Sequence, residues 1–196
     1  MDAIEALTTR VSAGPLGEPG PDAHALEQIL AAAMRAPDHG RLRPWRFLIV
    51  RGDARAKLGE LMARALRKRM PDIPDAQLER EKKKPMRAPM IVVVCCRIDA
   101  QARIPAIEQI VSAGTAAQNI MVAAHALGFG CAWKTGDAAY DPEVKAAFGL
   151  EPTDSIVGFM YLGTHAKTPA VPAPVDRRAH VAEWSGDVDR AMAPSV

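Results

Sequence analysis

One segment, residues 35–45, joins an amphipathic helix to a buried strand and constrains the fold more than any other part of the chain. Before this segment, apolar residues recur every three or four positions, which predicts a helix with one buried face. These residues are Leu26, Ile29, Leu30, Ala33 and Met34. Because the residue before a proline avoids the helical conformation, the helix should end near Ala36. After the segment, the apolar run 47–50 predicts a short buried strand.

The joining segment itself carries three arginines, one histidine and one tryptophan. Loops that are fixed by rigid elements at both ends commonly carry binding sites. Clustered cations can hold an anion through charge-assisted hydrogen bonds, and the flat ring of Trp45 suits a planar ligand. The same residues are also compatible with an ordinary packed turn, in which the tryptophan fills space and the arginines are only solvated.

Length and charge bound the possible functions. A chain of 196 residues is long enough for one domain with a hydrophobic core. The net charge of +2 lacks the basic clustering of a nucleic-acid-binding protein, and no apolar run approaches the roughly 18 residues of a membrane span. The N-terminus lacks the cationic start and apolar core of a signal peptide. We therefore expect one cytoplasmic domain over residues 1–196, without a nucleic acid or a membrane as partner.

The three cysteines predict neither a disulfide framework nor a metal site. Cys95 and Cys96 are adjacent in an apolar run, so in a strand they would point to opposite faces as packed thiols. We interpret Cys131 as a core residue. The chain has no His-x-x-x-His pair, and no metal is expected.

Beyond the joining segment, the sequence predicts a succession of helices and strands. Asp2, Asp22 and Asp53 are each placed to cap the start of a helix. A helix over about 105–127 is rich in small residues and apolar on nearly every side, which is typical of a helix buried at the centre of a domain or a dimer. Gly128 marks its end. The further strands are expected at 90–96, 129–133 and 155–163.

Two regions do not fit a regular element. Residues 70–89 contain four prolines and a run of three lysines, which favours a solvated, partly mobile excursion. The alternative is a lid over a site, which would favour anionic substrates or dinucleotide phosphates. From about residue 164 the chain is rich in proline and alanine and carries Arg177 and Arg178, so an extended arm is expected.

Several short motifs follow one another in a typical order. Arg-Ala-Pro-Asp-His is followed by Pro-Trp and a strand, and the second half contains Ala-Leu-Gly-Phe-Gly, Trp-Lys-Thr-Gly, Phe-Gly-Leu and Ile-Val-Gly-Phe-Met-Tyr-Leu-Gly. Over about residues 1–165 this order resembles the FMN-dependent nitroreductase family, most closely its compact NAD(P)H nitroreductase branch. The resemblance implies an α+β fold, in which helices flank a mixed β-sheet, and an interlocked homodimer with one FMN at each end of the interface.

The resemblance also implies which residues bind the cofactor. The FMN contacts carried over by position are Arg10, Val11, Ser12, Arg35, His39, Trp133, Lys134 and Thr135. Residues 123–128 match a stretch assigned to the nicotinamide dinucleotide, although the end of a buried small-residue helix explains this stretch equally well. Two positions depart from the family: Val11 replaces an arginine, and Arg43 stands where glutamine is usual. Arg177 and Arg178 could supply the charge that is lost at Val11.

The function implied by the resemblance is hydride transfer from NAD(P)H to FMN and then to a nitroaromatic, a quinone or a similar small acceptor. The flavin would carry the chemistry, so no catalytic nucleophile is expected, and Arg35 or Arg43 would stabilise the anionic reduced flavin. No G-x-G-x-x-G fingerprint is present, so NAD(P)H would visit as a substrate. The alternatives are a non-catalytic flavin-binding, storage or sensor protein of the same fold, and a flavin-consuming or dehalogenating relative.

Overall fold

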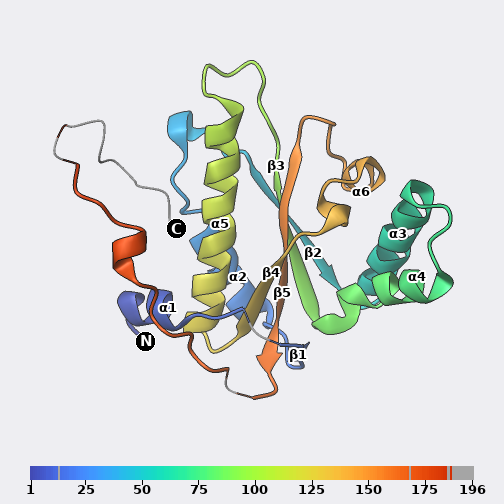
Figure 1. Ribbon diagram of the computed structural model, residues 1–196, viewed down its shortest axis with the longest axis horizontal. Helices are drawn as coiled ribbons and strands as arrows, with labels where there is room; N and C mark the ends of the chain where they lie inside the picture. The colour runs from blue at the N-terminus through green and yellow to red at the C-terminus, as the bar shows by residue number, and fades with distance from the viewer. Residues whose placement is uncertain (13, 168, 185, 187–196) are drawn as a thin grey trace.

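The computed structural model describes residues 1–12, 14–167, 169–184 and 186, which form an α+β fold around one five-stranded sheet (Figure 1). The strands are β1 (Leu16–Gly17), β2 (Trp45–Arg51), β3 (Met90–Cys96), β4 (Gly130–Lys134) and β5 (Ser155–His165). The α-helices are α1 (Ala3–Thr9), α2 (Ala23–Ala33), α3 (Ala54–Arg69), α4 (Asp75–Lys82), α5 (Ala106–Ala126) and α6 (Pro142–Ala147). Short 3-10 turns are η1 (His39–Arg41), η2 (Lys84–Arg87), η3 (Asp137–Ala139) and η4 (Arg177–Ala179).

The sheet separates two hydrophobic cores. Helices α2 and α5 cover one face, and α3, α4 and α6 lie on the other side (Figure 1). Strand β3 is buried at all seven positions because it has a strand on each side and a core on each face. Its side chains alternate between the cores, with Val93 in one cluster and Val92 and Val94 in the other. The continuous apolar run of β3 therefore reflects burial on both faces, as its sequence predicts.

The strand pairings differ from the mixed sheet that the resemblance implied. Every pairing among the described residues is antiparallel, in the order β1-β5-β3-β2, with β4 also paired to β5. Two helices, α3 and α4, connect β2 to β3. A single crossover helix would carry the chain back to the start of β2, whereas two helices return it to the end of β2. Strand β3 therefore begins there, with Met90 opposite Arg51, and runs antiparallel to β2. The α+β class is confirmed, whereas a parallel pairing is not found within the described part of this chain.

Helix ends follow the predicted signals with one exception. The carboxylates of Asp2 and Asp22 accept hydrogen bonds from the backbone three residues on, at 2.9 and 2.8 Å. Asp53 precedes α3 but makes no such bond, because it already has helical backbone angles. Gly128 ends α5 with φ +87°, and the N–H of Phe129 bonds to the carbonyl of Ala124 at 2.8 Å, as in a Schellman motif.

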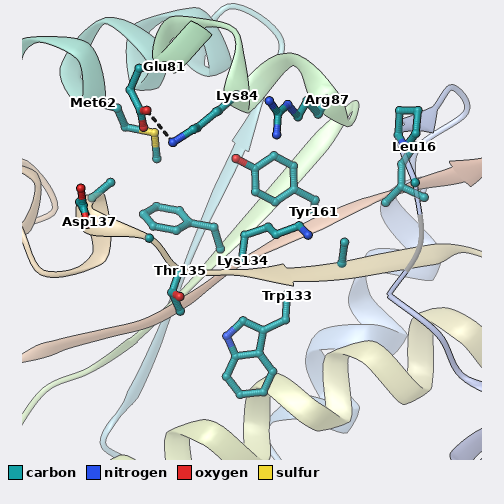
Figure 2. A pocket seen from close by; sticks show the side chains of 16 residues that line it. Leu16, Met62, Glu81, Lys84, Arg87, Trp133, Lys134, Thr135, Asp137 and Tyr161 are labelled. Carbon is teal, nitrogen blue, oxygen red and sulfur yellow. Dashed lines mark ion pairs between the residues drawn. The ribbon is translucent and has the colours of Figure 1, made fainter. Parts of the chain in front are cut away.

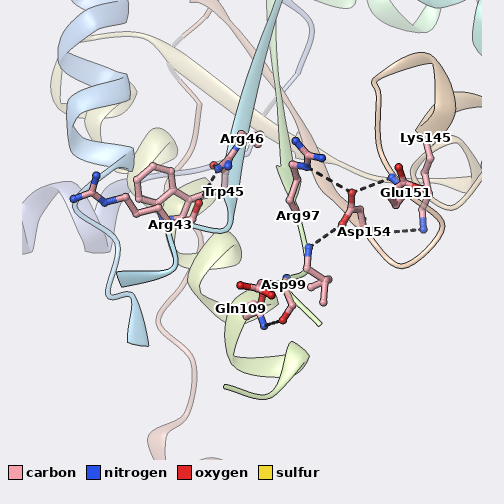
Figure 3. Close-up of polar contacts among 10 residues, drawn as sticks. Arg43, Trp45, Arg46, Arg97, Asp99, Gln109, Lys145, Glu151 and Asp154 are labelled. Atoms are coloured by element: carbon pink, nitrogen blue, oxygen red, sulfur yellow. Dashed lines mark hydrogen bonds and ion pairs between the residues drawn. The ribbon is translucent and has the colours of Figure 1, made fainter. Parts of the chain in front are cut away.

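A buried carboxylate fixes the connections at one end of the sheet (Figure 3). Asp154 is only 3% exposed and accepts hydrogen bonds from the backbone of Ile98 and Glu151 at 2.8 and 2.9 Å. Lys145 of α6 donates to its carbonyl at 2.7 Å. Gln109 of α5 similarly binds the backbone of the loop after β3. These bonds hold α5, α6 and the ends of β3 and β5 in one rigid frame.

The region 70–89 is more regular than its prolines suggest. It forms α4 and η2, and both pack against α3. Ile73, Pro85 and Ala88 are buried. Gly59 of α3 lies directly against the backbone of Lys82, so no side chain fits between the two helices. None of the helices in the described part of the chain combines the length and the hydropathy that a membrane span requires.

Replacing Gly59 with alanine should therefore destabilise the protein. A Cβ at this position would overlap the Lys82 carbonyl, which is backbone and cannot rotate away. We expect Gly59→Ala to lower the free energy of unfolding by about 1–3 kcal/mol, as overpacking does in protein cores. Denaturant unfolding measures this change, with the exposed Lys68→Ala on the same helix as the matched control. Equal stability of the two variants would contradict the close packing of α3 on α4.

Candidate active site

A cavity of about 730 Å³ lies on the sheet face that α3, α4 and η2 cover (Figure 2). Its floor is formed by Phe159 and Tyr161 of β5, and Met62 of α3 closes one wall. The loop of residues 14–16 forms the opposite side. Charged side chains from four elements, α4, η2, β4 and η3, line it: Glu81, Lys84, Arg87, Lys134 and Asp137.

Strand alternation decides which predicted residues face this cavity. Lys134 lies on the cavity side of β4 with Tyr161, whereas the ring of Trp133 lies on the other side of the strand, toward α5 (Figure 2). The indole N–H of Trp133 donates to the carbonyl of Val157 at 3.1 Å, and its ring fills the space above Gly158. Trp133 thus anchors β4 to β5, and Thr135 and Gly136 continue the cavity wall beyond the strand.

The cavity holds positive charge that the protein does not fully neutralise. Lys84 pairs with Glu81 at 2.5 Å. Arg87 and Lys134 make no ion pair within the portion of the chain that the structure describes. Burial raises the pKa of Tyr161 to about 12, and Arg87 offsets part of that rise. At neutral pH the cavity therefore presents two free cations beside a neutral phenol.

The predicted N-terminal contacts, Arg10 to Ser12, lie at the C-terminal end of α5. The hydroxyl of Thr9 is 2.9 Å from Nε2 of His125 in the last turn of that helix. The guanidinium of Arg10 donates one long hydrogen bond, of 3.5 Å, to the Ser12 hydroxyl. Its Nε is buried without a hydrogen-bond partner. Val11 is half-buried. Because residues 14–16 line the cavity, this segment leads directly into it.

The predicted contacts from the joining segment lie elsewhere. Nδ1 of His39 is 2.6 Å from a carboxylate oxygen of Glu108, in the first turn of α5. Arg35 is exposed just after α2. Glu108 and His125 lie at opposite ends of α5. At the rise per residue of an α-helix, they are about 25 Å apart. One chain therefore does not bring His39 together with Arg10 and Ser12.

The loop between His39 and Trp45 is held in an unusual backbone conformation. Arg41 and Arg43 have φ of 58° and 50°, a region that non-glycine residues seldom occupy. The Asp38 carboxylate supports this conformation by accepting from the N–H of Arg43 at 2.8 Å. Trp45 is half-buried and stacks on Phe47 with ring centroids 5.8 Å apart, so within one chain its ring packs as in an ordinary turn. The exposed Arg43 does not line the cavity.

Arg177, Arg178 and the three cysteines lie outside the cavity. Arg177 and Arg178 are exposed in η4, where Arg178 bonds to Asp176 and neither lines the cavity. The three cysteines are free and buried, which confirms that they are packed thiols. No group of three potential metal ligands occurs among the described residues.

Comparison with known proteins places this geometry in a family. Residues 16–164 match the model of the Nitroreductase family. The chain belongs to the nitroreductase family. It is 39% identical over 164 residues to YdjA of Escherichia coli (strain K12), which is named provisionally as an NAD(P)H nitroreductase; the match covers 84% of this chain and 88% of YdjA.

Solved structures show the same fold at lower sequence identity. A nitroreductase-like family protein from Bacillus cereus has a TM-score of 0.81 at 23% identity, over 95% of this chain and 97% of the other. A provisionally named nitroreductase from Desulfovibrio desulfuricans, solved in complex with FMN, has a TM-score of 0.72 at 22% identity, over 93% and 96%. The chain therefore has the nitroreductase fold that its motifs resemble.

Sequence reasoning did not assign several residues of the cavity to the site, among them Met62, Arg87 and Tyr161. Lys84 belongs to the lysine run that the alternative interpretation of residues 70–89 placed over a site, and the structure puts it in the cavity wall. Tyr161 lies on the same face of β5 as Phe159, two residues away, so the alternation of the predicted strand could have identified it.

The buried cysteines give a test of the core that surrounds the site. Burial raises the pKa of Cys95 and Cys131 to about 12 and that of Cys96 to about 11, and the thiolate is the reactive form. We expect a thiol reagent at pH 8 to label no cysteine in the folded protein and all three after unfolding. Mass spectrometry of the two samples counts the labels. Rapid labelling of the folded protein would contradict the packing described here.

Proposed function

We propose that this protein is an FMN-dependent oxidoreductase that passes hydride from NAD(P)H to a nitroaromatic, a quinone or a similar small acceptor. The observation that carries the proposal is a cavity with an apolar, aromatic floor and free cations, lined by the loop of residues 14–16 that follows Arg10 and Ser12 in the chain. The names of the relatives, and the FMN bound to the Desulfovibrio protein, support it.

The residues present fit this cofactor. Arg10 and Ser12 would hold the phosphate, and the buried, unpartnered Nε of Arg10 marks a donor that awaits an acceptor. Phe159 and Met62 offer an apolar surface to a planar ring system and exclude water from it. When bound, the flavin would supply the hydride-accepting and hydride-donating chemistry.

The remaining cavity residues would tune the charge of the site. Arg87 and Lys134 are placed to stabilise the negative charge of the reduced ring, a role that sequence reasoning assigned to Arg35 or Arg43. Tyr161 stays protonated at neutral pH and can donate a hydrogen bond to a bound acceptor. The cations, the tyrosine hydroxyl and the aromatic floor of the cavity would thus all contact the ring system of one bound flavin.

We further propose that two copies of the chain share each site. Helix α5 carries a stripe of residues that is apolar yet open in the single chain, with Ile107 and Val111 exposed by 64% and 59%. A two-fold interface along α5 would cover this stripe. If the two copies of α5 run in opposite directions, Arg35 and His39 of one copy approach Arg10 and Ser12 of the other. This arrangement would unite the residues that α5 separates within one chain.

The function is tested by visible absorption spectra of the purified protein, before and after anaerobic addition of NADH or NADPH. We expect flavin bands that bleach when the nucleotide is added. Flavin bands that persist with both nucleotides would favour a storage or sensor protein. A colourless protein that does not take up added FMN would contradict the proposal.

The shared site predicts complementation between two defective variants. Arg10→Ala and Arg35→Ala should each weaken FMN binding or slow flavin reduction, because each removes a cation from the site. In a mixed dimer, one of the two sites would contain both wild-type arginines. We therefore expect refolded mixtures of the two variants to recover up to about a quarter of the wild-type sites, since half of the dimers are mixed and each holds one intact site of two.

The control is Arg51→Ala, which removes an exposed arginine at the end of β2, away from the cavity. FMN titration and stopped-flow reduction provide the two measurements. Wild-type FMN affinity and reduction rate in Arg35→Ala would contradict its role. Defective variants that do not complement would contradict the division of the site between copies.

A further inference from the structure

Two histidines from different elements lie near the predicted phosphate contacts. His125 lies in the last turn of α5, and His165 is the last residue of β5. Nε2 of His125 is 2.9 Å from the hydroxyl of Thr9, the residue before Arg10. His165 lies against the start of β4, where a Cβ added to Gly130 would be 2.6 Å from its Nε2. His165 is not part of the binding set expected from the family resemblance, and His125 lies in the stretch 123–128 that the resemblance matched to the nicotinamide dinucleotide, not to FMN.

The backbone fixes both imidazoles at this place. The glycine turn at residue 128 ends α5 and leads directly into β4, so His125 stays close to the start of that strand. The pairing of β1 with β5 sets His165 opposite Leu16. Gly130 has no side chain, and the imidazole of His165 occupies the space that one would fill. The pair therefore results from three strands and one helix end that meet at one point.

The surroundings of this pair are positive. Burial and the neighbouring His125 lower the pKa of His165. Burial raises the pKa of Cys131, and Arg10 offsets part of that rise, so the Arg10 guanidinium lies within electrostatic range of the residue after Gly130. No hydrogen bond or ion pair joins either imidazole to a carboxylate in the part of the chain described here. His125 thus lies beside the residue before Arg10, and His165 lies at the start of β4, both without a bonded carboxylate among the described residues.

We propose that His125 and His165 complete, with Arg10 and Ser12, a subsite for the phosphate of FMN, in place of the arginine that Val11 replaces. This inference rests on the proposed function. Imidazole N–H groups and a guanidinium are good phosphate donors, and the buried Nε of Arg10 has no other partner. Arg177 and Arg178 are less suited, because both are exposed and Arg178 is bonded to Asp176.

The subsite has a consequence for pH. Histidine changes its charge near neutral pH, and an imidazolium attracts phosphate more strongly than a neutral imidazole does. Burial lowers the pKa of His165 in the free protein, and a bound phosphate opposes this shift, so phosphate binding should strengthen as the pH falls from 8 to 6. Riboflavin has the same ring system but no phosphate, so its affinity should not follow this trend. The ratio of the two affinities isolates the phosphate from the ring.

The experiment measures dissociation constants of FMN and riboflavin by quenching of flavin fluorescence, at pH 6 and pH 8. The variants are His125→Gln, His165→Gln and the double variant of the full-length protein. His24→Gln is the matched control, because His24 is exposed on α2. Circular dichroism verifies that each variant is folded, and either single variant suffices if the other does not fold.

We expect the double variant to bind FMN at least about tenfold more weakly than the wild type at pH 6, with an unchanged affinity for riboflavin. The preference for FMN over riboflavin should change with pH more in the wild type than in the double variant. The phosphate of FMN titrates in the same way in both experiments. Comparing the wild type with the double variant therefore removes the contribution of the phosphate to the pH dependence. The control should match the wild type.

Three results would overturn the inference. An equal FMN-to-riboflavin ratio in wild type and double variant, at both pH values, would exclude the two histidines from the subsite. A variant that binds FMN normally but has a weaker affinity for NADPH would assign the pair to the dinucleotide phosphates instead. A wild-type protein that binds neither flavin would contradict the proposed function itself, which the other two results leave intact.

Discussion

The hydrogen-bonded pairings of β5 are the constraint on which the rest of the structure depends. This strand pairs with β1, β3 and β4, and so it sets the positions of elements that are distant in the sequence. Phe159 and Tyr161 form the cavity floor from its middle, and β4 brings Lys134 to the rim. Its last residue, His165, lies against Gly130. A shift of β5 by one residue would reverse which side chains face the cavity.

Helix α5 imposes the second constraint. It is long enough to hold His39 at one end, through Glu108, and Thr9 at the other, through His125. The same rigidity that orders these contacts keeps them about 25 Å apart. A cofactor that needs both groups cannot be bound by one copy of this chain. The exposed apolar stripe of α5 offers a physical reason for two copies to associate, because it removes that surface from water.

The elements were largely predictable because local signals specified them. The fully apolar run of β3, the aspartate caps at residues 2 and 22 and the glycine turn at residue 128 all act within a few residues. The two failures have different causes. Asp53 has the right residue type, but it follows the turn at Gly52 with helical backbone angles and so makes no cap bond. The prolines of 70–89 hide helices that are stabilised by packing on Gly59, a contact between residues that are distant in the sequence.

The sequence by itself determined the order of helices and strands, the nitroreductase family and the buried state of the cysteines, because periodicity, caps and motifs are local. Only the tertiary structure decided how the predicted residues group. It turned the ring of Trp133 away from the cavity, brought Lys84 and Arg87 into it, and left His39 at the far end of α5. Sheet register and helix packing set these positions, and both arise from contacts across the sequence that no single segment encodes.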